Sequence, residues 1–382
     1  MNPPTQPFEA PGGELTAREI VQQPDVWLEV AALVERERAR FDAFLRSSLA
    51  NPRIRVVLTG AGTSSYIGAC LAPALSRQLG RRVEAVATTD LVSGPHLYLQ
   101  RDVPTLLVSF ARSGDSPESV AAADLAQRAL DEVHHLVITC NADGVLARQM
   151  SGTANACVLV LPDSTHDRAF AMTASFTSMV LAAGLIFGAI ARERVATLAR
   201  ACAVSLPLLQ AAAGDLAARK FERAVFLGSN GLQALAAEAA LKMLELSDGR
   251  TVALSQSVLG FRHGPKTIVN DRTLIVVFVS NDPYTRAYDL DLLDELRREA
   301  RAGAIVAVGA GAPSGASLEL AGMASACDLE LALVDVVFAQ SLGLRQSLQL
   351  GITPDNPNAA GTVSRVVKGV RIHAWPGSGT VS

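Results

Sequence analysis

The most constraining feature of this 382-residue chain is that its second half repeats the first. In both halves, apolar runs typical of buried strands alternate with helical stretches, which is the pattern of an α/β protein with parallel sheets. Three pairs of such runs align at offsets of 169, 169 and 170 residues: Leu58 with Leu227, Ile138 with Ala307, and Leu159 with Leu329. A nearly constant offset across separate strands indicates an internal duplication.

The duplication predicts the domain organisation. Strand-like runs lie at 54–62, 104–114, 134–141 and 156–162 in the first copy, and at 223–231, 272–282, 303–311 and 327–334 in the second. We therefore predict an α/β fold of two tandem doubly wound parallel-sheet domains, at 50–192 and 215–352. A helical lead at 1–49 precedes them, and a tail at 353–382 follows.

Charge and cysteine content exclude several classes of function. The net charge is −3 and no run is rich in Lys or Arg, so nothing indicates a nucleic-acid partner. The five cysteines are scattered, without a CxxC pair or a histidine at metal-ligand spacing, so we expect no metal site and a reducing compartment. The N-terminus is polar and Pro-rich rather than a signal peptide. These features predict a cytoplasmic protein.

One segment has the length and composition of a membrane span. Residues 169–191 carry no charged side chain, and a stretch of that length could cross a bilayer. Its counterpart in the second copy, 336–351, contains Arg345. We therefore predict a helix buried in the protein core rather than a membrane partner.

Two loops of the first copy are candidates for a ligand site, because ligands bind at the carboxyl ends of the strands in such sheets. The first, TGAGTSSYIG at 59–68, follows a strand and opens a helix. Gly62 allows close approach of the backbone to a ligand, and Thr63 and Ser64 supply hydroxyl groups. The loop lacks the GxGxxG spacing of a dinucleotide site and the motif of a nucleotide P-loop.

The second loop, SFARSGDSPES at 109–119, is the stronger candidate. Gly114 permits a tight turn, and Ser113 and Ser116 precede a helix predicted to begin near Pro117, whose free N–H groups favour an anion. The alternative is that Ser116 only caps the helix. The corresponding loop of the second copy, 279–289, is bulkier and poorer in serine, which favours one phosphate site per chain.

A second group of candidates lies in the second copy and the tail. Glu238, Lys242 and Glu245 are spaced i, i+4 and i+7 in an otherwise apolar helical stretch, so they share one helix face. For Glu238 and Lys242 the alternative to a functional role is a buried ion pair that only stabilises the core. Glu245 is the candidate general base. His263 lies in a loop beside Gly-Pro and is able to titrate near neutrality. From the residues alone, Lys368 is a solvated tail lysine.

The motifs GTSSYIG, SFARSGDSPES, EAALKMLEL and FRHGP together resemble the sugar isomerase (SIS) domain family. The paired arrangement resembles the isomerase half of glutamine-dependent glucosamine-6-phosphate synthase. The resemblance is closer to the galactosamine-6-phosphate deaminase/isomerase family, formerly called tagatose-6-phosphate ketose/aldose isomerase. That family's patterns are matched at residues 87–93, 109–119, 135–144, 260–266, 278–286 and 350–357.

The resemblance implies a role for each candidate residue. Those that would bind the sugar phosphate are Gly62, Thr63, Ser64, Ser113 and Ser116, with Arg112 a further substrate-side candidate of open role. Glu245 would move a proton between C1 and C2, and Glu238 and Lys242 would support it. His263 would help to open the sugar ring in the neighbouring subunit's site, which implies at least a homodimer, and Lys368 would close over the open-chain sugar.

Two departures from the synthase narrow the chemistry. Ala111 stands where the synthase has a serine, which fits the deaminase branch, and residue 2 is Asn2 rather than the cysteine of a glutaminase domain. The resemblance thus implies conversion of an amino-sugar 6-phosphate to a ketose 6-phosphate and ammonia, without a metal or redox cofactor. Simple ketose/aldose isomerisation, deglycation of a sugar-amine 6-phosphate, and a non-enzymatic sugar-phosphate sensor are alternatives. The sequence leaves open galacto against gluco substrate and dimer against tetramer.

Overall fold

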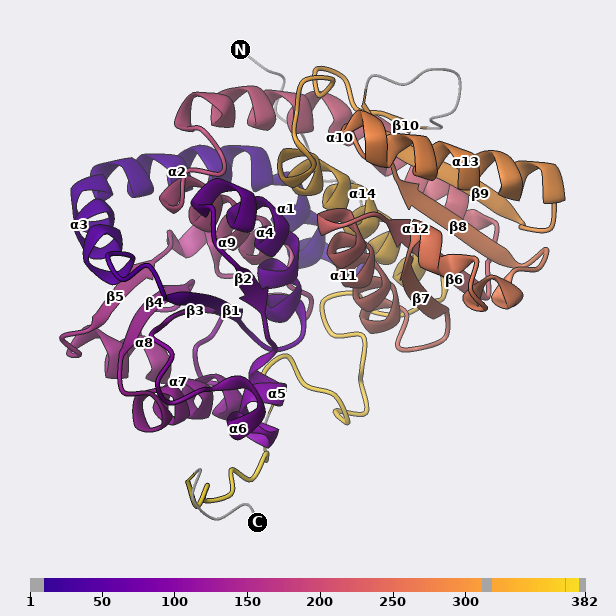
Figure 1. Cartoon of the computed structure of the whole chain (residues 1–382). Helices are drawn as coiled ribbons and strands as arrows, with labels where there is room; N and C mark the ends of the chain where they lie inside the picture. The colour runs from indigo at the N-terminus through magenta and orange to yellow at the C-terminus, as the bar shows by residue number, and fades with distance from the viewer. Residues whose placement is uncertain (1–9, 311–317, 368, 378–382) are drawn as a thin grey trace. The chain divides into compact units, whose positions relative to one another are not determined.

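A computed structural model of the chain describes residues 10–310, 318–367 and 369–377 (Figure 1). These residues divide into two compact units. Unit 1 comprises the described residues of Met1–Leu28, Asp167–Ala174 and Arg192–Gly361, and unit 2 those of Glu29–His166, Ser175–Ala191 and Thr362–Ser382. The chain therefore passes between the units several times, and each unit is built from distant segments of the sequence.

Unit 2 is built around a parallel sheet of five strands in the order β2-β1-β3-β4-β5. The strands are β1 (Arg55–Thr59), β2 (Val83–Ala85), β3 (Thr105–Ala111), β4 (Val133–Thr139) and β5 (Ala156–Val160). Its helices are α3 (Arg38–Ser48), α4 (Thr63–Leu79), α5 (Thr88–Ser93), α6 (Pro95–Tyr98), α7 (Pro117–Ala129) and α8 (Val145–Ser151), with the short 3₁₀ helix Asp163–Thr165. Two helices cross the unit boundaries: α2 (Gln23–Arg36) and α9 (Ala174–Ile186).

The central strand of this sheet shows why the sequence folds in this way. All seven residues of β3 are buried, as expected of a parallel strand that is covered by helices on both faces. In Figure 1, α7 and α8 lie on one face of the sheet, and α4 and α9 lie on the other. The loops at the carboxyl ends of the strands are thereby the part of the sheet left for a ligand.

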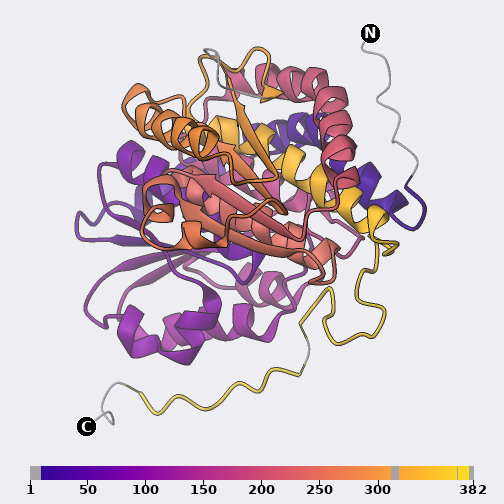
Figure 2. The ribbon, with the colours of Figure 1, turned by 90° about the vertical axis from the view of Figure 1, so that its right-hand side faces the viewer.

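Unit 1 repeats this architecture with the order β10-β9-β8-β6-β7, again with every pair parallel. The strands are β6 (Arg223–Gly228), β7 (Val252–Ser257), β8 (Thr273–Phe278), β9 (Ala304–Gly309) and β10 (Leu318–Glu319). The helices are α1 (Glu14–Val21), α10 (Val195–Ala218), α11 (Gly231–Leu246), α12 (Val258–Phe261), α13 (Pro283–Glu299) and α14 (Asp328–Gln349), with 3₁₀ helices Arg192–Arg194 and Pro265–Ile268. Helices α12 and α13 pack on one face, and α11 and α14 on the other (Figure 2).

The two sheets have the same strand order when the strands are matched as β1 with β6, β2 with β7, β3 with β8, β4 with β9 and β5 with β10. The predicted fold of two doubly wound parallel sheets is therefore confirmed. The domain boundaries predicted from the sequence, 1–49, 50–192, 215–352 and 353–382, stay a prediction.

One predicted strand is wrong. Residues 327–334 belong to the start of α14, and the fifth strand of unit 1 is the two-residue β10. The reason is a helix start signal: Cys327 and Glu330 form a capping box around the first turn of α14. The alignment of Leu159 with Leu329 therefore pairs a strand with a helix, whereas the other two alignments pair strands.

The charge-free segment is a buried helix, as predicted. Helix α9 has 13 residues, fewer than the ~20 that a membrane span needs, and Phe176, Met179 and Leu181 are at most 1% exposed. Among the described residues, the one stretch that is long and apolar enough for a span is Arg192–Ala218, and 44% of its apolar 18-residue window is buried. A core helix of a water-soluble protein has the same properties, so this stretch alone does not indicate a membrane.

Two carboxylates, Glu19 and Asp355, fasten helix α1 within unit 1, and a third, Asp167, closes the neighbouring segment 167–173. Glu19 Oε1 accepts hydrogen bonds from the backbone N–H groups of Arg168 (2.6 Å) and Ala169 (3.2 Å). Asp167 and Asp355 likewise accept backbone N–H groups, those of Thr173 and Thr16. Burial, with the charge of Asp167 as a smaller cause, raises the pKa of Glu19 from 4.5 to about 7.

This pKa predicts how stability depends on pH. The folded chain keeps the Glu19 proton at pH values where the unfolded chain has lost it, so the stabilisation is full below pH 4.5 and is lost as pH rises to about 7. Glu19→Gln keeps the acceptor oxygen without the charge, and should be more stable than the wild type at pH 8 by up to about 3 kcal/mol. At pH 4.5 the two proteins should unfold alike.

The measurement is urea unfolding at both pH values. Glu14→Gln, an exposed position on the same helix, is the control and should shift stability equally at both. A Glu19→Gln effect that did not change with pH would contradict the assignment.

Candidate active site

In unit 2, the topology itself selects one position for a ligand. Strands β1 and β3 are neighbours, with Thr59 paired to Ser109 at their carboxyl ends. After β1 the chain turns through α4 to β2 on one side of the pair, and after β3 it turns through α7 to β4 on the other. Ligands of open α/β sheets bind where the connections diverge in this way. Both loops singled out by the sequence flank this switch point.

The loop after β1 is compact and leads directly into α4. Gly62 is the residue before the helix, with φ +56° and ψ −128°, a conformation that favours glycine. A Cβ atom on Gly60 would lie 2.5 Å from the backbone of Ser64, so the loop closes tightly on the helix. Thr63 and Ser64, at 4% and 5% exposure, are held in the first turn of α4.

The loop after β3 presents hydroxyl groups at the start of α7. Gly114 has φ +71° and turns the chain, and Pro117 begins the helix with Ser116 before it. Within the described part of the chain, the Ser116 side chain makes no capping hydrogen bond. The first-turn N–H groups of α7 and the hydroxyl of Ser116 thus fit an anion better than they fit a closed helix cap.

A neighbouring loop holds the phosphate-loop candidate in shape. Asn141 Nδ2 donates to the Ser113 carbonyl at 2.8 Å, and the Val145 N–H donates to Asp115 Oδ1 at 3.0 Å. A Cβ atom on Gly144 would lie 2.4 Å from the Ser113 carbonyl oxygen. Only glycine allows this approach, so residues 141–145 act as the rigid support of the loop.

In unit 1 the equivalent switch point, between β6 and β8, is occupied by the chain's own carboxylates. Asp289 of α13 accepts hydrogen bonds from the Ser229 hydroxyl (2.6 Å) and the Ser280 N–H (2.9 Å). Asp328 accepts from the Ser280 hydroxyl (2.7 Å) and the Asn281 N–H (2.9 Å). The chain's own carboxylates thus already accept from the donor groups at these strand ends, which is a physical reason to expect a phosphate only in unit 2.

The three charged residues of α11 form one buried row. Lys242 Nζ lies 3.4 Å from Glu238 Oε1, and both side chains are fully buried, so the ion pair expected as an alternative is present. Lys242 also donates to Glu245 Oε2. Glu245 is 24% exposed, so it alone of the three offers a carboxylate oxygen to a ligand.

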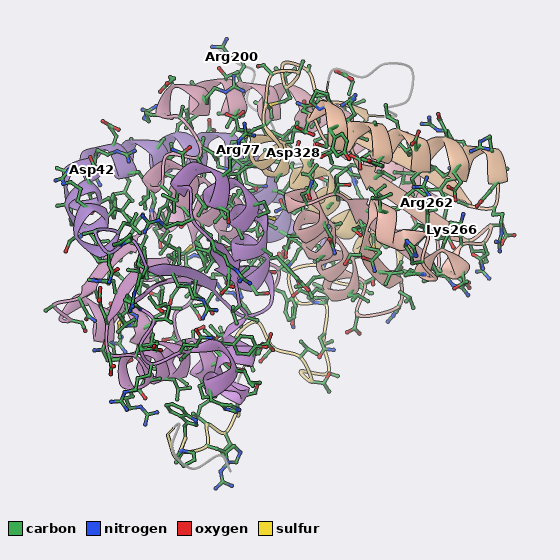
Figure 3. The ribbon with its side chains drawn as sticks, in the orientation of Figure 1. Asp42, Arg77, Arg200, Arg262, Lys266 and Asp328 are labelled. Carbon is green, nitrogen blue, oxygen red and sulfur yellow. The ribbon has the colours of Figure 1, made fainter. Side chains whose placement is uncertain are left out.

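His263 lies on an exposed turn, and the cations on either side of it, Arg262 and Lys266, hold this turn in place through ion pairs. Gly264 has φ +121°, which bends the chain directly after the histidine. Arg262 Nε donates to Glu295 Oε2 at 2.8 Å, and Lys266 donates to Glu295 Oε1; both cations are labelled in Figure 3. Hydrogen bonds from Lys266 and Arg262 lower the pKa of Glu295 below its usual value, so this carboxylate stays charged and holds the turn against α13.

Arg112 and Lys368 complete the predicted set. Arg112 Nη2 donates to the Arg365 carbonyl at 2.7 Å, so this side chain contacts the C-terminal tail. Lys368 lies outside the described residues. Among those described, no three His, Cys, Asp or Glu side chains gather in a way that could hold a metal ion.

Comparisons with known proteins show which proteins this chain resembles. The SIS domain family model matches residues 48–189. A protein named AgaS from Streptomyces coelicolor is 52% identical over 366 residues, 94% of this chain and 95% of that protein. The D-galactosamine-6-phosphate deaminase AgaS of Escherichia coli is 44% identical over 97% of this chain and 98% of its own length. The crystal structure of tagatose-6-phosphate ketose/aldose isomerase from Escherichia coli superposes with a TM-score of 0.89 at 42% identity, covering 97% of this chain and 100% of that one.

The support of the phosphate loop is testable without touching a predicted phosphate contact. Gly144→Ala places a methyl group against the Ser113 carbonyl, so we expect inorganic phosphate to bind at least about tenfold more weakly, the factor for 1.4 kcal/mol of loop displacement. Titration calorimetry gives the affinity. Gly152→Ala is the control because no atom lies within 4 Å of the added Cβ. Equal phosphate affinity of the two variants would contradict the role of Gly144.

The fastening of the His263 turn is testable by hydrogen exchange. Glu295→Gln removes the charge that holds both Arg262 and Lys266, so backbone amides at 259–268 should exchange roughly fivefold faster. Glu299→Gln removes only one of the two partners of Lys266 and should have a smaller effect. Unchanged exchange in Glu295→Gln would show that the ion pairs do not hold the turn.

Proposed function

This chain belongs to the SIS-domain family of D-galactosamine-6-phosphate deaminases, and we propose that it converts an amino-sugar 6-phosphate to a ketose 6-phosphate and ammonia. The proposed substrate is D-galactosamine 6-phosphate and the proposed product tagatose 6-phosphate, as the names of the relatives suggest. We assign phosphate binding to the loops after β1 and β3, and proton transfer to Glu245 of α11.

The phosphate would be held by hydroxyl and N–H groups rather than by a cluster of cations. Thr63, Ser64, Ser113 and Ser116 lie in the two loops that flank the switch point, with Gly62 at the start of α4 and the N-terminal turn of α7 beside them. Such a set of donors, aided by the helix dipole, suits a phosphate dianion and leaves the sugar free to extend from it.

The observation that carries the chemistry is the state of Glu245. Its carboxylate is partly exposed, while its partner Lys242 is fully buried and shared with Glu238. Lys242 and Glu238 together fix the orientation of Glu245, so that the exposed oxygen has a defined position. A positioned carboxylate is what abstraction of a proton next to a carbonyl group requires.

The reaction then follows from the amino group on C2. In the open-chain aldose, Glu245 takes the C2 proton, the C2–H electron pair forms the C1=C2 bond, and the C1=O π pair moves to O1, which takes a proton from solvent, giving an enolamine. Glu245 then returns its proton to C1, and the nitrogen lone pair forms the C2=N bond of an imine. Water adds to this imine, the C2–N bond breaks, and the products are the ketose 6-phosphate and ammonia. His263 would protonate the ring oxygen when the ring opens, and Lys368 retains its role as a prediction from the family resemblance.

The assembly and compartment are part of the same proposal. We propose a cytoplasmic homodimer or tetramer in which His263 serves the site of a neighbouring subunit. Support comes from its exposed position on a fastened turn, where it is accessible to a second chain.

Simple ketose/aldose isomerisation is the second candidate, because the Escherichia coli structure that superposes on this chain bears that name. The two reactions share Glu245 and differ in the group on C2 of the substrate. Ammonia release distinguishes them directly, and a sugar-phosphate sensor would catalyse neither.

The test is an ammonia assay with galactosamine 6-phosphate and glucosamine 6-phosphate as alternative substrates. We expect release from the galacto sugar, and a loss of about a thousandfold in kcat for Glu245→Gln, the size of a general-base contribution. Glu193→Gln, an exposed position of unit 1, is the control and should keep full activity. Ammonia from neither sugar, with tagatose 6-phosphate isomerised instead, would favour the second candidate.

A further inference from the structure

In its described residues, 362–367 and 369–377, the C-terminal tail of unit 2 forms no helix or strand, yet a hydrogen bond and an apolar contact hold it to the unit. The carbonyl of Arg365 accepts the hydrogen bond from Arg112. Ile372 lines a cavity of ≈600 Å³ between α7 and α8, together with Asp115 and Pro117. Trp375 packs against the apolar cluster of α5 and α7. The tail therefore lies close to α7, the helix whose start is the phosphate-loop candidate.

Arg112 is the link between this tail and the phosphate loop. It is the first residue after β3, it is 7% exposed, and it is bonded covalently to Ser113. A buried guanidinium that donates to a carbonyl makes a charge-assisted hydrogen bond, which is stronger than a neutral one. The residue that bonds Arg365 is thus the direct neighbour of Ser113 in the loop, so the loop and the tail are linked through one residue.

We propose that Arg112 is a positioning residue that couples anion binding at the phosphate loop to docking of the tail on unit 2. An anion that fixes residues 112–116 in the observed conformation also fixes the Arg112 guanidinium, and so favours the docked tail. By reciprocity, a docked tail raises the affinity of the loop for the anion. This inference rests on the phosphate site of the proposed function, but on none of its chemistry.

The chain carries its own reporter of the coupling. Trypsin cleaves after Arg365, and the scissile carbonyl is the one that accepts from Arg112, so cleavage requires this hydrogen bond to break. The second reporter is Trp375, since the only other tryptophan, Trp27, is fully buried. Acrylamide quenching therefore measures the exposure of Trp375, and Trp375→Phe identifies its share of the signal.

The experiment follows both signals in the full-length chain with and without inorganic phosphate, whose binding is measured separately by calorimetry. Phosphate should slow cleavage after Arg365 and reduce quenching in the wild type. Arg112→Met should be cleaved about tenfold faster or more, the factor for loss of one charge-assisted hydrogen bond, and phosphate should no longer slow it. Arg112→Lys should restore part of the protection. The control is Arg101→Met, an arginine of unit 2 that is 73% exposed and paired with Asp131.

Each outcome decides the proposal. If phosphate binds the wild type and leaves cleavage after Arg365 unchanged, the coupling is overturned while the phosphate site stands. If phosphate does not bind, the site itself is wrong and the coupling falls with it. Equal cleavage of Arg112→Met and Arg101→Met also overturns it. The wild-type response to phosphate needs no variant, so the test holds even if Arg112→Met does not fold.

Discussion

A doubly wound parallel sheet leaves its loops free at one edge and makes them diverge at one switch point, and this constraint organises both halves of the chain. In unit 2 the divergence lies between β1 and β3, and in unit 1 between β6 and β8. Each switch point brings together the ends of two strands and the N–H and hydroxyl donors of the loops that follow them. Something negative must satisfy those donors. In unit 1 it is the pair Asp289 and Asp328; in unit 2 we propose that it is the phosphate of the substrate.

The second organising interaction is the charged row of α11. Two fully buried charges, Glu238 and Lys242, are expensive to remove from water, and the pair persists because each neutralises the other. Lys242 also reaches Glu245 at the partly exposed end of the row. The buried Glu238–Lys242 ion pair therefore contributes to the proposed function, because the Lys242 ammonium group determines where the partly exposed Glu245 carboxylate lies.

Local patterns in the sequence predicted the central strands, the duplication and the serine loop. The strands β1, β3 and β4 could be found because they are buried apolar runs, which are typical of parallel strands. The three-residue β2 and the mostly half-buried β7 carried no such pattern and were missed. The start of α14 was mistaken for a strand because its first turns are apolar and alternate with acidic residues. Glycine turns and helix starts are local signals, so the loops around Ser113 and Ser116 could be found from sequence.

Contacts between distant residues could not be predicted in this way. Nothing near Arg112 in the sequence points to Arg365, 253 residues away, and nothing near Ser229 points to Asp289. The signal that existed was the bulk of the loop at 279–289 compared with its serine-rich counterpart. The same limit applies to Glu295, whose role is visible only when the turn at 262–266 is seen against α13.

The carboxylate of Asp289 stabilises the residues that precede helix α11. Its hydrogen bond to Ser229 holds the two residues that lead into α11, Ser229 and Asn230. Because Asp289 is a residue of the chain itself, this hydrogen bond does not require a bound substrate. The start of the helix that carries Glu245 is therefore held by a side chain of the protein itself, whereas we propose a bound phosphate for the equivalent position of unit 2.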